Sequence, residues 1–205
     1  MSKTARTAAT KTPVSTLAEA TACVLQFKIT LLNTEPPIWR RIQVVPETLG
    51  DLHMAIQSAM GWEDSHLFEF EIGKRRFSDL DPEMPTWDED AADAFETPLL
   101  DFIPDNKRKK LRFRYLYDFG DSWEHEVLFE GRRELGPKTR YPLCLEGERA
   151  CPPEDCGGVW GFYDLLGALD DPQNEQHDYY REWLGEYDAE SFDAQAATRR
   201  MQGWR

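Results

Sequence analysis

Two stretches of alternating apolar residues flank a short polar turn in this chain, and they restrict the fold more than any other feature. Apolar or aromatic side chains recur at every second position on both sides of the turn, at Leu111, Phe113, Tyr115, Tyr117, Trp123, His125, Val127 and Phe129. A period of two is typical of strands that bury one face. Because residues 118–122 form only a short connection, the sequence predicts an antiparallel hairpin. Its expected cross-strand pairs are Tyr117 with Trp123, Tyr115 with His125 and Arg114 with Glu126.

The remaining elements are predicted by alternation and by helical spacing. We expect strands over residues 24–32, 38–45, 66–72 and 75–77, a helix over 49–60, and a long surface loop over 79–98. Thr48 and Asp51 resemble a capping box at the start of that helix. From Gly158 onward the apolar spacing becomes helical, with a last helix expected near Ser191. The predicted fold class is α+β, a mostly antiparallel sheet with one helix after the first hairpin and a C-terminal group of about three helices.

Length and composition favour one domain behind a tail. A chain of 205 residues with 40% hydrophobic content is enough for a single core. Residues 1–21 are rich in Ala, Thr and Ser and have no apolar periodicity, so we expect a disordered tail. Residues 22–205 are expected to form the domain.

The charge of the chain restricts its partners. A formal net charge of -14 repels phosphate backbones, so duplex nucleic acid is an unfavourable partner. No apolar run approaches the roughly 20 residues that span a bilayer, and the N-terminus lacks a hydrophobic signal core. Four cysteines without a secretory signal are typical of reduced thiols or metal ligands in the cytoplasm. We therefore expect a cytoplasmic protein without membrane association.

Three cysteines crowd into one segment that also contains Pro152-Pro153 and Gly157-Gly158. Thiolates and imidazoles are the ligands that zinc prefers, and a stiff loop can present several of them together. The first hypothesis is a zinc site formed by Cys144, Cys151, Cys156 and His125, with His66 or His53 as other sources of the fourth ligand. The spacing lacks the close pairs of common zinc modules, so small buried thiols that only pack are the open alternative.

A second hypothesis makes Cys156 a nucleophile. It precedes two glycines and a predicted helix N-terminus, where the helix dipole and free backbone N–H groups stabilise a thiolate. His125 or His66 would act as the base, and Asp118 or Asp121 would orient it. The two histidines have similar neighbours and could also bring imidazoles and carboxylates to one sheet edge, where they would bind a catalytic divalent ion.

A third hypothesis concerns the aromatic residues. Seven tryptophans and seven tyrosines could form a groove for a protein or peptide, although core packing explains many of them. Arg40, Arg41, Arg112 and Arg114 could form a local basic strip, which keeps single-stranded nucleic acid open as a ligand.

Five segments in order resemble the root-inducing-plasmid ORF-three-like family. They are Phe27-Lys-Ile-Thr-Leu31, Pro36-Pro-Ile-Trp-Arg-Arg41, Met60-Gly-Trp-Glu-Asp-Ser-His66, Tyr117-Asp-Phe-Gly-Asp-Ser-Trp-Glu-His125 and Cys151-Pro-Pro-Glu-Asp-Cys156-Gly-Gly. The resemblance covers about residues 22–200 and implies an α+β domain whose biochemical role is not established. Members are often labelled transposon-passenger or resolvase-like, which implies an association with mobile elements. A resolvase needs a nucleophilic serine in an arginine-rich site and a basic DNA-reading helix, and this acidic chain shows neither.

These observations favour a binding or accessory module for a protein or small-molecule partner. Its functional surface is expected to combine the cysteine loop, residues 118–125 and His66. The alternative is a metal- or thiol-dependent hydrolase that uses the same loop with His66 or His125, and zinc is the cofactor that either reading would accept.

Overall fold

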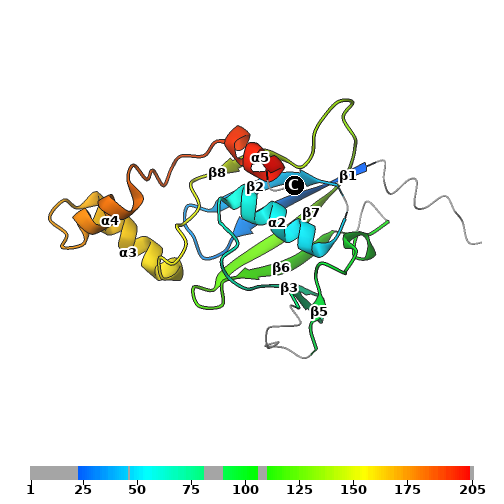
Figure 1. The fold of residues 1–205 in the computed structure, drawn as a ribbon, viewed down its shortest axis with the longest axis horizontal. Helices are drawn as coiled ribbons and strands as arrows, with labels where there is room; N and C mark the ends of the chain where they lie inside the picture. The colour runs from blue at the N-terminus through cyan, green and yellow to red at the C-terminus, as the bar shows by residue number, and fades with distance from the viewer. Residues whose placement is uncertain (1–22, 46, 81–89, 106–109, 204–205) are drawn as a thin grey trace, which may run out of the picture.

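A computed structural model describes residues 23–45, 47–80, 90–105 and 110–203, and these residues form an α+β fold built on one sheet (Figure 1). The strands are β1 (Cys23–Leu31), β2 (Ile38–Val44), β3 (Phe68–Ile72), β4 (Arg75–Ser78), β5 (Ala92–Asp93), β6 (Leu111–Tyr117), β7 (Trp123–Glu134) and β8 (Leu143–Glu148). The helices are α2 (Leu49–Met60), α3 (Gly158–Asp170), α4 (His177–Leu184) and α5 (Ala194–Gly203), with a short 3-10 turn η1 (Leu99–Asp101).

The sheet has the spatial order β5-β4-β3-β6-β7-β1-β2-β8. Every described pairing is antiparallel except the short parallel contact between β4 and β5. The predicted class, a mostly antiparallel sheet with one helix after the first hairpin and three C-terminal helices, is therefore confirmed among the described residues.

The hairpin of β6 and β7 has the predicted register. Its pairs include Tyr117 with Trp123, Tyr115 with His125 and Arg114 with Glu126. Because side chains alternate across a strand, the aromatic positions all face the interior and the arginine and glutamate positions face outward. Trp123, Tyr115 and His125 are fully buried as a result.

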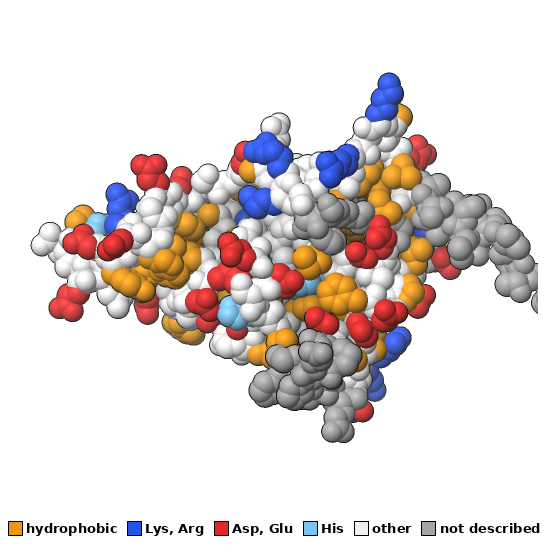
Figure 2. All heavy atoms as spheres, in the orientation of Figure 1, with side chains coloured by type: hydrophobic (Ala, Val, Ile, Leu, Met, Phe, Trp, Pro, Cys, Tyr) orange, Lys and Arg blue, Asp and Glu red, His pale blue; other side chains and the backbone are white. Residues whose placement is uncertain are grey.

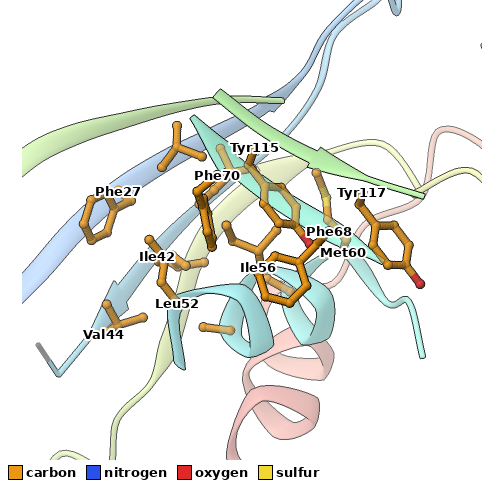
Figure 3. Close-up of a cluster of buried hydrophobic side chains, with 14 of the residues drawn as sticks. Phe27, Ile42, Val44, Leu52, Ile56, Met60, Phe68, Phe70, Tyr115 and Tyr117 are labelled. Carbon is orange, nitrogen blue, oxygen red and sulfur yellow. The ribbon is translucent and has the colours of Figure 1, made fainter. Parts of the chain in front are cut away.

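Helix α2 covers the inner face of the sheet. Thr48 and Asp51 form the predicted capping box, and Gly61 ends the helix in a left-handed conformation with φ of 105°. The apolar stripe of the helix packs into a cluster of buried side chains from the sheet, which Figure 3 shows around Leu52, Ile56 and Met60. Full burial of each such side chain stabilises the fold by about 1.5–3 kcal/mol.

The C-terminal helices divide into two groups. Helix α5 lies against α2 and β8, whereas α3 and α4 project away from the sheet (Figure 1). We call α3, α4 and their connection, residues 158–184, the arm. The chain leaves toward the arm and returns from it at one place, because the backbone N–H of Ala150 donates to Ala189 O at 2.9 Å.

Several details differ from the sequence predictions. Strands β5 and β8 were not predicted, so Cys144 lies in a strand paired with β2 and not in a loop. β8 is short and contains Gly147, which weakens its alternating pattern. His66 precedes β3 by two residues, and the last helix begins at Ala194. The predicted tail over residues 1–21 and the centre of the predicted loop over 79–98 lie outside the described residues.

None of the described helices is both long and apolar enough to span a bilayer.

Candidate functional site

Three loops from distant parts of the chain meet at one end of the sheet. The loop over residues 61–67 leads into β3, the turn over 118–122 joins β6 to β7, and the connection over 149–157 follows β8. The strands that carry these loops all have the relevant terminus at the same end of the sheet. This follows from the strand register, in which Phe68 pairs with Tyr117, Leu31 with His125 and Trp39 with Glu148. The sheet order therefore brings the loops together.

Direct hydrogen bonds fasten the loops to one another. The Trp62 indole N–H donates to Pro152 O at 3.0 Å, and the Glu63 backbone N–H donates to Glu154 Oε1 at 2.7 Å. The Asp118 backbone N–H donates to Leu67 O at 2.9 Å. The 149–157 connection is thus held over the 61–67 loop, which in turn is held to the hairpin turn.

His66 faces three carboxylates at this junction. Its Nε2 atom lies 3.2 Å from Asp155 Oδ1, 3.5 Å from Glu154 Oε2 and 3.8 Å from Asp118 Oδ2. Nε2 is buried yet makes no hydrogen bond to the described residues, although the whole side chain is 27% exposed. Among the residues that the structure describes, His66, Asp118 and Asp155 are the one group of three His, Cys, Asp or Glu whose ligand atoms lie within 4.8 Å of one another. We call these three residues the His66 group.

The local backbone conformation places the carboxylates of Asp118 and Asp155 close to His66. Asp118 and Asp155 both adopt positive φ, 55° and 57°, a region that aspartate tolerates better than most residues. Asp118 Oδ1 accepts a hydrogen bond from the Gly120 N–H at 2.8 Å, which leaves Oδ2 on the side of His66. Asp155 follows two prolines and Glu154, so its position depends on a stiff segment.

Glu154 is held beside the His66 group by Tyr117. The Tyr117 hydroxyl donates to the Glu154 carboxylate at 3.1 Å and accepts from the Ser65 backbone N–H at 3.0 Å. Burial, followed by the charge of Glu154, raises the pKa of Tyr117, so the hydroxyl keeps its proton for this bond. Glu154 is therefore a fixed carboxylate within reach of any ion bound by the group.

The donor set suits a divalent cation. One imidazole and two or three carboxylates combine a ligand that Zn²⁺ accepts with oxygens that Mn²⁺ prefers. A cation would also offset the repulsion between carboxylates gathered at one point. Figure 2 shows acidic side chains gathered around a histidine on the surface between the arm and the sheet.

A cleft of about 710 Å³ reaches the His66 group at Asp155, and Glu154 lines it as well, whereas His66 and Asp118 line a separate, smaller pocket of about 280 Å³. Its other lining residues include aromatic side chains and two arginines, among them Trp62, Tyr187, Phe192, Arg40 and Arg200. A cleft of this volume accommodates a small molecule.

The cysteines lie outside the His66 group. Cys144 is buried in β8, with its Sγ 3.7 Å from Glu146 O, while Cys151 and Cys156 are partly exposed. Burial raises the pKa of Cys144 to about 11 and that of Cys151 to about 12. The described residues contain no group with ligand atoms within 4.8 Å that joins the predicted set of Cys144, Cys151, Cys156 and His125.

Cys156 lies directly before the N-terminus of α3, as the sequence predicted. Gly157 and Gly158 have φ of 91° and 68°, and α3 begins at Gly158. Burial first, and then the charge of Asp121, raise the pKa of Cys156 to about 12. Asp121 itself accepts a hydrogen bond from the Gly157 N–H at 3.1 Å, so it fixes the start of α3 to the hairpin turn.

The other two predicted histidines belong to the interior. Burial lowers the pKa of His125 to about 3, and its ring lies edge-on to Trp62 with the centroids 5.4 Å apart. His53 is also fully buried, where Nδ1 lies 2.8 Å from the Tyr115 hydroxyl and Nε2 lies 2.8 Å from Asp64 Oδ1. Both are neutral core residues, and neither reaches the His66 group.

The residues that the sequence reasoning missed are Glu154 and Asp155. They stand between Pro152-Pro153 and Cys156, in the segment that drew attention for its thiols. The available signal was a pair of acids on a proline-stiffened loop. In a chain with 38 acidic residues that signal is faint.

Known proteins are similar to this chain over most of its length. A family model described as plasmid pRiA4b ORF-3-like protein matches residues 23–196. The uncharacterized protein y4hQ of Sinorhizobium fredii is 42% identical over 172 residues, which cover 83% of this chain and 85% of that protein. The crystal structure of MM3350, a protein of unknown function from Methanosarcina mazei Go1, gives a TM-score of 0.74 at 36% identity, covering 85% of this chain and 97% of that one.

Proposed function

Because the chain belongs to the plasmid pRiA4b ORF-3-like family, whose relatives named above are described only as uncharacterized or of unknown function, we propose a function from the site itself. The protein binds a divalent cation at His66, Asp118 and Asp155, and the cation completes a binding site for a small molecule in the adjoining cleft. Zn²⁺ and Mn²⁺ are the ions that this donor set fits.

The observation that carries this proposal is the state of His66 Nε2. The atom is buried, has no hydrogen bond to the described residues, and stands within 3.8 Å of a carboxylate oxygen from each of Asp118, Glu154 and Asp155. A buried polar atom without a hydrogen bond costs about 1–3 kcal/mol. A cation at the junction would satisfy the nitrogen and balance the carboxylates together.

Metal-dependent hydrolysis is a second candidate because the cation would stand beside the cleft. Three or four protein ligands leave coordination positions for water and for a substrate atom. A divalent ion in such a position lowers the pKa of a bound water and polarises an oxygen. The chain's own part would be to hold the ligands, through Tyr117 and the Asp118 turn, and to admit the substrate through the cleft.

The test is a calorimetric titration of chelator-treated protein with Mn²⁺ and with Zn²⁺. We expect about one ion per chain, and an affinity that falls by at least about tenfold in Asp118→Asn, since even loss of an outer partner of a ligand costs that much. Asparagine keeps the Oδ1 acceptor for Gly120 and tolerates positive φ, so the turn should persist.

Asp121→Asn is the matched control. Asp121 lies in the same turn as Asp118 but is not in the His66 group, and its replacement by asparagine removes the same charge. Its cation affinity should change by less than about threefold, which is the scale of an exposed charge interaction. The proposal fails if neither ion binds, or if the two asparagine variants bind the ions equally well.

A further inference from the structure

We propose that the cleft holds the carboxylate or phosphate of a small molecule against Arg40 and Arg200. The inference deepens the proposed function, and it rests on that function only for the ligand's second contact, the cation at the His66 group. The first contact depends on the arginines alone.

Arg40 is a buried cation without an acidic partner. Its side chain belongs to β2 and is 1% exposed, and it lines the cleft. Nε donates to Ala59 O at 3.1 Å, and Nη1 donates to Trp39 O at 2.8 Å and Glu148 O at 2.9 Å. Among the described residues no carboxylate lies within 4.0 Å of the guanidinium, and no hydrogen bond uses Nη2.

Other arginines of the fold do have such partners. Arg149, which is only 8% exposed, pairs with Glu190 at 2.7 Å, and Arg41 pairs with Glu130 at 2.7 Å. A buried charge is costly unless it is paired, so the exception at Arg40 requires a reason. Burial first, and to a smaller extent the charge of Arg200, lower the pKa of Arg40.

Arg200 stands beside Arg40 from a different element. It belongs to α5, lines the same cleft, and donates from Nε to Ser58 O at 3.0 Å. No carboxylate of the described residues lies within 4.0 Å of it either. Two guanidinium groups that repel each other and share one cleft form a site for an anion.

The lining of the cleft defines the ligand further. Arginine binds carboxylates and phosphates through paired N–H groups, and Trp62, Tyr187 and Phe192 offer flat apolar walls for a ring or chain. Phe192 also stacks on the Arg40 guanidinium, with 4.0 Å between its ring centre and Cζ. Six acidic side chains also line the cleft and would repel an anion: Glu63, Glu154, Asp155, Glu186, Asp188 and Asp193. A cation at the His66 group would offset this repulsion next to Glu154 and Asp155, so the ligand's anionic group is expected at the arginines and not at the acidic rim.

The experiment follows the Arg40 side chain by nuclear magnetic resonance. Its Nε–H is held by Ala59 O and should give a slowly exchanging signal, assigned by its absence in Arg40→Lys. Benzoate and phenyl phosphate are titrated as probes into chelator-treated protein and into protein loaded with Zn²⁺. Benzamide serves as the control, because it keeps the ring without the charge.

We expect at least one of the two anions to shift the Arg40 signal saturably, while benzamide does not. The dissociation constant should rise about tenfold in Arg200→Gln, the loss of one charge-assisted contact. Arg200 is exposed and its hydrogen bond to Ser58 O lies at the surface, so this variant should fold with only a small decrease in melting temperature, and it decides the test if Arg40→Lys does not fold. Tighter binding of benzoate would identify a carboxylate ligand, and tighter binding of phenyl phosphate a phosphate ligand.

The inference is overturned if neither anion shifts the Arg40 signal saturably in either form of the protein, if benzamide binds as well as they do, or if Arg200→Gln binds them unchanged. Cation affinity, measured separately in Arg200→Gln, should equal that of the wild type. Failure of the cation proposal would appear in the Mn²⁺ and Zn²⁺ titrations, whereas failure of the anion proposal would appear only in the Arg40 signal.

Discussion

Replacing Gly158 by alanine should destabilise the protein by about 3 kcal/mol, whereas the same replacement at Gly167 in the same helix should stabilise it by up to about 1 kcal/mol. Gly158 has φ of +68°, and a Cβ there would stand 2.5 Å from Asp121 O, a backbone atom of the hairpin turn. At Gly167 a Cβ would meet nothing within 4 Å. Both variants replace glycine by alanine within α3, so the difference between them reports the local environment of each position.

The magnitude follows from three contributions. The left-handed conformation costs an L residue roughly 1–2 kcal/mol. Overpacking against a neighbour that cannot move away adds about 1–3 kcal/mol. The smaller conformational freedom of unfolded alanine returns about 0.4–1 kcal/mol. At Gly167 only the helix propensity and the unfolded-state contribution apply, and both favour alanine.

Urea denaturation followed by far-ultraviolet circular dichroism measures the free energy of unfolding of each variant, with the slope checked against that of the wild type. Since Gly158 contacts Asp121 and lies close in sequence to Asp155, Gly158→Ala should also weaken cation binding. Equal stability of Gly158→Ala and wild type, or changes of the same sign in both variants, would show that the contact between α3 and the hairpin turn does not have the geometry described above.

Two further predictions concern buried titratable groups. Because burial holds the pKa of His125 at about 3 in the folded protein against about 6.5 when unfolded, its contribution to stability is complete above pH 6.5 and is lost as the pH falls toward 3. Between about pH 6.5 and 4.5 the wild type should therefore lose about 2 kcal/mol more than His125→Gln, and parallel stability curves for the two proteins would contradict this. Because burial raises the pKa of Cys144 to about 11 and that of Cys151 to about 12, iodoacetamide should alkylate both in the folded protein at rates that still rise at about pH 10, where an ordinary thiol has levelled off. Site-resolved peptide mass spectrometry measures these rates, and a plateau near pH 9 at either cysteine would contradict the raised pKa of that thiol.

The hairpin could be predicted because its determinants are local. Tyr115 faces His125 in the structure since strict alternation on each side of a short turn permits one register that buries the aromatic face. The capping box at Thr48 and Asp51 was predictable for the same reason, because both partners lie within one turn of helix.

The His66 group could not be predicted in this way because it depends on the order of the strands. Asp118 reaches His66 only because β3 pairs with β6, and Asp155 reaches it only because β8 pairs with β2 at the other side of the sheet. No local pattern specifies either neighbour. The rarity of cysteine also drew attention to thiols, while the two acids beside them looked like ordinary solvated residues.

The two histidines with similar neighbours took different roles for a physical reason. His125 lies inside β7, so alternation turns its side chain into the core. His66 precedes β3 and is not subject to that alternation, which leaves its ring free to face the carboxylates. A difference of two residues in where a strand begins separated a packing residue from a candidate ligand.

The contacts at the base of the arm determine which part of the molecule can unfold locally. Where the chain leaves for the arm and returns, the Ala150–Ala189 hydrogen bond and the Arg149–Glu190 ion pair join the two segments to each other. Beyond that base, α4 has no buried residue, whereas α3 buries Phe162 and Leu165, so little apolar surface would be exposed if α4 alone unfolded. Amide hydrogens of α4 should therefore exchange with solvent quickly, through local unfolding of that helix. Those of β1 and β7 should exchange much more slowly, because their exchange requires the whole sheet to unfold.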